Sequence, residues 1–374
     1  MSWPARVHRG PESLLLDGPL AQRMLDALWD TDPLGDAAAE ALEREPIWLA
    51  RLDDPAPAMP APLRALLDAA SEAPDWVDRA RVDRAGALLF RAGVAGGIVL
   101  GAKSLVAGYC SPAGNKPLAM TGQLRTRVSH RLAETSKYVV STCTAGALRP
   151  GAEGWTITLR VRLMHAHVRR LIERSGDWRP AKWGAPINQH DMVATSLLFS
   201  SVFVEGLRQL GVPVSRDEAD DFVHLWRYAS WLMGCREDLL PRDMHDAARL
   251  TRLIRRTQGP PDDDSRALTH ALLESPRSSL QGRPAELQVA LGHGFCRALL
   301  GDEVADQLQV EGHRVAALVR ALRIPARLAP KPSPERLEAA GRRYWQRAID
   351  EGRAGRPLEF RPPRALLQRV AGTA

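Results

Sequence analysis

Cysteine is scarce in this 374-residue sequence, and the four cysteines lie far apart, at Cys110, Cys143, Cys235 and Cys296. No two of them form a CxxC pair or the spacing of a zinc ribbon. We therefore expect four reduced, structural thiols. The length and the few cysteines together exclude a small scaffold that is held by disulfides.

The sequence also lacks a long apolar segment. Its start, MSWPARVHRGPESLLLDG, has no apolar run of the kind found in secretory signals, which predicts a cytoplasmic protein. The longest uncharged apolar run near the middle, residues 92–102, is far shorter than the roughly 20 residues that span a bilayer. No transmembrane segment is expected, whereas peripheral contact of the basic C-terminal tail with a membrane stays open.

Apart from the basic C-terminal tail, charge of one sign is not concentrated in any segment. The sequence has 51 Lys and Arg against 44 Asp and Glu, a net charge of +7, with the arginines interspersed among acids. A nucleic-acid-binding surface needs basic residues gathered on one face, so no nucleic-acid partner is expected. Neither a Walker-type phosphate loop nor a GxGxxG dinucleotide signature is present.

Strand-like alternation is confined to WTITLRV, at residues 155–161. Elsewhere apolar residues recur at spacings of three and four, which predicts an all-α protein. Helices are expected at, among others, residues 82–109, 124–144, 155–174, 192–210, 217–233, 304–322 and 334–352. We expect a single domain over residues 1–374, with an N-terminal helical arm at 1–80 and a Pro/Arg-rich C-terminal extension at 325–374.

The predicted helix at residues 82–109 is rich in glycine, at positions 86, 93, 96, 97 and 101. Each glycine costs about 1 kcal/mol of helix propensity relative to alanine, so tertiary contacts must hold this segment. Close approach of another backbone or of a flat ligand would explain the glycines. A tightly packed pair of core helices without a ligand would explain them equally well.

His165 stands in an apolar stripe of the predicted helix at residues 155–174. Val161, His165, Val168 and Ile172 recur at spacings of four, three and four, so they share one face. His167 points about 200° away around the same helix and cannot share a ligand role with His165. A histidine in such a stripe is either a hydrogen-bonded core residue or an axial ligand of a cofactor.

Arg131, Glu134, Thr135 and Tyr138 share one face of the predicted helix at residues 124–144. Arg131 and Glu134 alone would make an ordinary surface ion pair. The alternative is a face in which Arg131 and Thr135 line a cofactor pocket.

Four stretches occur in a recognisable order: RLAET at residues 131–135, VRLMHAHVRR at 161–170, GAPINQHDM at 184–192 and YASWLMGCREDLLP at 228–241. This order resembles the MpaB-type oxygenase family, which includes the bacterial latex clearing proteins that cut rubber. The resemblance covers most of the chain except its first 60 and last 50 residues.

The resemblance implies a globin-like helical core with additional N- and C-terminal helices. It also implies one haem b whose iron is held by His165, with Arg131 and Thr135 beside the cofactor. Arg131, Glu134 and Thr135 occupy the positions of the distal, catalytic side. We expect the second ring nitrogen of His165 to be hydrogen-bonded, because such a bond fixes the orientation of a ligating imidazole.

Two positions depart from the rubber-cleaving members. Those proteins have a lysine where this sequence has Glu134, and a glutamate that acts as catalytic base where an ungapped register puts Asn115. An asparagine cannot take a proton, so the resemblance favours a substrate other than rubber.

The expected function is therefore that of a haem b-dependent oxygenase. It would use O2 to oxidise or cleave a C=C bond of a small apolar substrate, isoprenoid or lipid-like, with an electron donor that the sequence does not identify. One alternative is a non-catalytic haem-binding or sensor protein. A less favoured alternative is a non-haem metal enzyme that uses His165 with His190 and Asp191.

Overall fold

The computed structural model describes residues 2–45, 52, 58–121, 128–278, 280–328 and 332–358. Within these ranges every regular element is a helix and no strand occurs, which confirms the all-α prediction. The strand-like WTITLRV segment belongs to a 22-residue helix, because tertiary packing of a long amphipathic helix outweighs a short alternating pattern.

The helices are short or of moderate length, and their bounds are as follows: α1 Gly10–Asp26, α2 Pro33–Arg44, α3 Ala61–Ser71, α4 Arg79–Ala85, α5 Ala87–Val99, η2 Leu100–Leu105, α6 Val106–Tyr109, α7 Lys116–Thr121, α9 Val128–Thr142, α10 Glu153–Arg174, α11 Pro180–Trp183, α12 Gln189–Phe199, α13 Ser201–Gln209, α14 Arg216–Leu232, η3 Glu237–Leu239, α15 Met244–Thr257, α16 Asp263–Leu273, η4 Ser275–Ser278, α17 Gly282–Leu300, α18 Asp302–Gln307, α19 His313–Leu328 and α20 Pro334–Arg353.

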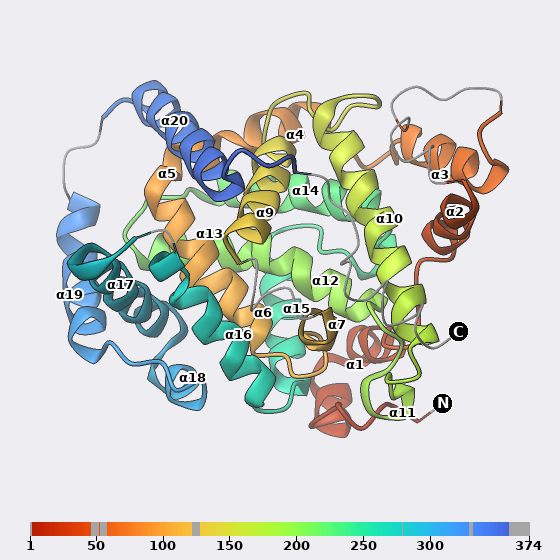
Figure 1. Cartoon of the computed structure of the whole chain (residues 1–374), viewed down its shortest axis with the longest axis horizontal. Helices are drawn as coiled ribbons and strands as arrows, with labels where there is room; N and C mark the ends of the chain where they lie inside the picture. Colours follow the sequence, from red (N-terminus) through yellow and green to blue (C-terminus); the bar gives the residue numbers. More distant parts are fainter. Residues whose placement is uncertain are drawn as a thin grey trace.

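Helices from the N-terminal part and from the C-terminal part of the chain pack around the central helices. Helices α5 and α6 run through the middle of the molecule, and α20 lies across α5 and α9 (Figure 1). Helices α2 and α3 pack together beside α10 on one side, and α17, α18 and α19 form a group on the other. Trp345 and Ile349 of α20 are buried, so this helix of the predicted C-terminal extension contributes to the core.

Residues Arg79–Tyr109 form one long apolar run through the core. Their mean hydropathy of 1.6 and their length would allow a membrane crossing, and 56% of the apolar window is buried inside the protein. One such run is weak evidence for a membrane span, because the core helices of globular proteins have the same length and composition. The run is kinked at Gly93, where φ is +46°, and continues as the π-helix η2.

The glycines of this run permit close helix packing. A Cβ on Gly86 would lie 1.7 Å from the carbonyl oxygen of Cys143, which follows α9. On the facing helix α20, a Cβ on Gly341 would lie 1.7 Å from the carbonyl oxygen of Phe90. Of the two explanations that the sequence leaves open, close packing accounts for Gly86 and for Gly97, where a Cβ would lie 2.0 Å from the hydroxyl of Tyr344 on α20, whereas a Cβ on Gly101 meets nothing within 4 Å.

Two predicted helices are each divided in two. The predicted helix at residues 192–210 is interrupted at Ser200, whose φ of −107° and ψ of −93° are not helical. The predicted helix at 304–322 is interrupted by residues 308–312, where Gln309 and Gly312 have positive φ. The guanidinium of Arg297 donates to the carbonyl oxygens of Val310 and Glu311 and holds this break against α17.

Gly341→Ala tests the close approach of α20 to α5. We expect the variant to lose about 1–3 kcal/mol of unfolding free energy, because the added methyl group forces the two helices apart. Gly101→Ala is the matched control, since a Cβ on Gly101 meets nothing within 4 Å and gains helix propensity. Urea unfolding would measure both variants, and equal stabilities would contradict the packing explanation.

Candidate functional site

A cavity of about 300 Å³ lies between α7, α9, α10, α12 and α14. Its wall is mostly apolar, and the apolar side chains that line it include Leu118, Val161, Met164, Val168, Ile187, Met192, Phe199, Trp226 and Met233. Phe199 and Trp226 stack with ring centroids 5.1 Å apart, which makes one side of the wall flat and rigid. A cavity of this size and polarity suits an apolar ligand with a few polar contacts.

His165 reaches this cavity from α10. Burial, together with the nearby cations of Arg169 and Arg131, lowers the pKa of His165 to about 4. The imidazole is therefore neutral at neutral pH, which is the form that binds a metal. Its Nδ1 atom is buried and has no hydrogen-bond partner within the described ranges. The expected hydrogen bond on the second ring nitrogen is thus not found there.

His167 behaves as the helical spacing predicts. It does not line the cavity, and its Nδ1 lies 3.4 Å from a carboxylate oxygen of Glu43. The two histidines of α10 therefore face different surroundings, and only His165 is available to a ligand in the cavity.

The α9 face that the spacing identifies also lines the cavity, at Arg131, Glu134, Thr135 and Tyr138. Arg131 donates from Nη1 to Oε2 of Glu134 at 3.1 Å, and Glu134 is only 7% exposed. Thr135 donates its hydroxyl to the carbonyl oxygen of Arg131 at 3.0 Å. The Arg131–Glu134 pair is therefore part of the cavity wall and differs from an ordinary surface pair.

The carboxylate of Asp191 forms an ion pair with Arg6, near the N-terminus of the chain. Arg6 donates to both carboxylate oxygens of Asp191 at 2.7 Å, and Nδ1 of His190 lies 3.2 Å from one of them. Although burial opposes ionisation, the Arg6 guanidinium and His190 hold the pKa of Asp191 well below its usual range. The carboxylate therefore stabilises the fold at neutral pH, and this contribution is lost only in strong acid, as the pH falls through its lowered pKa.

The non-haem alternative requires His165, His190 and Asp191 to converge. Over the described part of the chain, side chains that could share a metal converge in two places, and neither includes His165. The described residues give this less favoured alternative no support, because Asp191 is paired through both carboxylate oxygens with Arg6.

Asn115 does not line the cavity. Its amide nitrogen donates to the carbonyl oxygen of Tyr109 at 2.8 Å and to the hydroxyl of Ser265 at 3.0 Å, and the side chain is 2% exposed. Asn115 is therefore a structural residue that joins the segment before α7 to α16, and its neighbour Gly114 faces the cavity instead.

The sequence reasoning missed the residues that hold α10 in place. Arg162 forms a bidentate pair with Asp32 at 2.7 and 2.8 Å. Arg169, 1% exposed, pairs with Asp36 and donates to the carbonyl oxygens of Pro186 and Ile187. The sequence feature that could have identified these two arginines is their spacing, one turn before and one turn after His165, on a helix that is largely buried.

Residues 81–331 match the family model described as "ER-bound oxygenase mpaB/B'/Rubber oxygenase, catalytic domain". The chain belongs to this oxygenase family. The match contains every cavity residue named above on α7, α9, α10, α12 and α14, and it confirms the resemblance that the four stretches indicate.

Two known proteins are similar to this chain. The rubber oxygenase of Streptomyces sp. (strain K30) is 24% identical over 256 residues, which cover 67% of this chain and 61% of that protein. The chain thus matches less than two thirds of that relative's length. The structure of a latex clearing protein in the closed state superposes with a TM-score of 0.67 at 22% identity, covering 86% of this chain and 91% of the other, and supports the shared fold.

Proposed function

We propose that this member of the oxygenase family is a haem b-dependent enzyme that uses O2 to oxidise or cleave a C=C bond of a small apolar substrate. The observation that carries the proposal is His165: a neutral imidazole with a buried, unpartnered Nδ1, turned into an apolar cavity. Family membership supplies the oxygenase class.

The donor set of the cavity fits a haem. A ring nitrogen of His165 would bind the iron, and the apolar residues of α10 and α12 would cover the porphyrin. Bound haem would supply the O2 chemistry, which belongs to the cofactor. The guanidinium of Arg131 would neutralise a propionate or polarise bound oxygen from the α9 side.

Glu134 and Thr135 have separate roles in this proposal. Glu134 holds the Arg131 guanidinium at the cavity wall through the 3.1 Å contact. Thr135 commits its hydroxyl proton to the carbonyl oxygen of Arg131, which favours a packing role against the ring over donation to oxygen.

The proposed substrate is isoprenoid or lipid-like. The apolar cavity wall favours an unsaturated hydrocarbon, and an acid at position 134, where rubber-cleaving members carry lysine, favours a substrate other than rubber. The product would depend on whether the substrate, bound in the cavity, is cleaved at its C=C bond or hydroxylated.

The visible absorption spectrum tests the haem and its ligand. We expect purified wild-type protein to have a Soret band that shifts on reduction with dithionite, and His165→Ala to lose that band. His167→Ala is the matched control on the same helix and should keep the wild-type spectrum. A colourless wild type after haem reconstitution would sink the proposal and return His165 to the role of a core histidine.

Oxygen consumption tests catalysis separately from haem binding. We expect Arg131→Ala to keep its haem but to consume O2 with an unsaturated isoprenoid roughly a hundredfold more slowly, because a cation beside the reacting oxygen is removed. Lys137→Ala, which removes an α9 lysine paired with Glu153 outside the cavity, is the control. A haem-loaded wild type that turns over none of a broad alkene panel would favour the non-catalytic, haem-binding alternative.

A further inference from the structure

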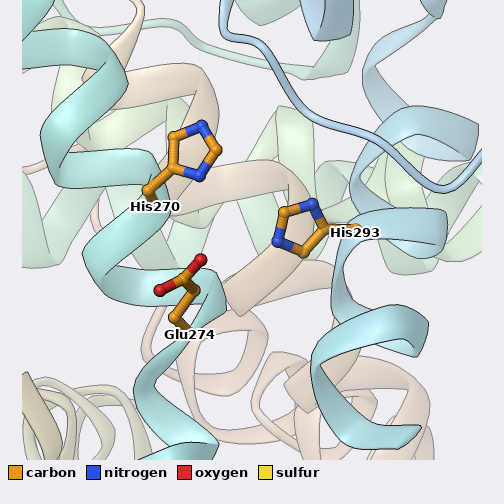
Figure 2. Close-up of side chains that lie close together, drawn as sticks. All are labelled: His270, Glu274 and His293. Atoms are coloured by element: carbon orange, nitrogen blue, oxygen red, sulfur yellow. The ribbon is translucent and has the colours of Figure 1, made fainter. Parts of the chain in front are cut away.

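A second set of metal-binding side chains lies away from the cavity. His270 of α16, Glu274 at the C-terminal cap of the same helix and His293 of α17 bring three donor atoms within 4.8 Å of one another. The two imidazole rings and the carboxylate face a common space between the two helices (Figure 2). None of the three residues lines the cavity that contains His165.

His270 is held in an orientation that suits ligation. It lies four residues before Glu274, the C-cap residue of α16, whose backbone N–H donates to the carbonyl oxygen of His270, so the two residues lie one turn apart on the same side. Its Nε2 lies 3.2 Å from the carbonyl oxygen of Leu308, a contact in which Nε2–H donates. Nδ1 then carries the lone pair, and a backbone carbonyl on the far nitrogen is the usual support of a ligating histidine.

His293 is the residue whose surroundings otherwise lack an explanation. It is 9% exposed, and neither ring nitrogen has a hydrogen-bond partner within the described ranges. A buried imidazole without partners costs free energy, which ligand binding would recover.

Glu274 keeps one carboxylate oxygen available. Its Oε2 lies 3.2 Å from Nη1 of Arg277, and Glu274 is otherwise exposed. Arg277 also makes a bidentate pair with Glu286 at 3.0 and 2.9 Å, so its charge is shared between two acids.

We propose that His270, Glu274 and His293 bind a divalent transition-metal ion of the zinc class and thereby join α16 to α17. Two histidines and one carboxylate are a common donor set for zinc, with water in the fourth position. In a tetrahedral site with metal–donor distances of about 2.0–2.2 Å, donor atoms lie roughly 3.3–3.6 Å apart, so side-chain rotations would bring these donors, now within 4.8 Å of one another, into place.

The other converging set, Asp243, His245 and Asp246, lacks this support. Asp243 accepts a hydrogen bond from the backbone N–H of Asp246 as the cap of α15, and the carboxylate of Asp246 accepts one from Arg242. Its residues serve as controls for the proposed site.

Zinc titration tests the proposal on the full-length protein after dialysis against a chelator. With a chromogenic zinc chelator as competitor, we expect one Zn²⁺ per chain. His293→Ala and Glu274→Gln should each weaken binding by at least roughly tenfold. His245→Ala should bind as the wild type does.

Glu274→Gln keeps the test decisive, because an exposed amide leaves the fold intact even if His293→Ala does not fold. Zinc should raise the melting temperature of the wild type and of His245→Ala more than that of Glu274→Gln. Absence of stoichiometric binding by the folded wild type, or unchanged affinity in Glu274→Gln, would overturn the proposal. Neither result depends on whether the cavity binds haem.

Discussion

Two buried arginines on α10 determine where His165 lies. Arg162 pairs with Asp32 and also donates to the carbonyl oxygen of Leu232 at the end of α14, while Arg169 pairs with Asp36. Removing one partner of such a buried pair typically costs about 3–5 kcal/mol, because a desolvated charge is left behind. Arg169 also places positive charge beside His165 and, together with burial and Arg131 of α9, lowers the pKa of its imidazole. Arg169 therefore contributes both to the anchoring of α10 and to the electrostatics around His165.

Residues outside the range that matches the family model make contacts with the core of the matched region. Asp32 and Asp36 precede residue 81, and so does Arg6, which neutralises Asp191 in the cavity wall. At the other end, α20 lies beyond residue 331 and covers α5 and α9 (Figure 1). The cavity is thus built from family residues, while flanking helices supply the charges and the apolar cover that fix its shape. Gly234 belongs to this anchoring: a Cβ there would lie 2.4 Å from an Asp32 carboxylate oxygen.

The features that can be predicted from the sequence are those that depend on the spacing of residues along a single helix. The helical class and the opposite orientations of His165 and His167 follow from spacing along one helix. Features that depend on contacts between residues far apart in the sequence cannot be predicted in this way. The break at residues 308–312 requires Arg297, the commitment of Asp191 requires Arg6, and the His293 set requires α16 and α17 to pack together. Ion pairs between residues far apart in the sequence produce no periodic pattern, so only the folded structure identifies them.

His165→Gly tests most directly the proposal that His165 would hold the iron of a haem in the cavity. Removing the side chain opens a space that free imidazole can fill without a covalent link to α10. The account predicts that this variant loses the Soret band and regains it, with the wild-type shift on reduction, when imidazole is added. A haem spectrum that is unchanged by His165→Gly and insensitive to imidazole would contradict it.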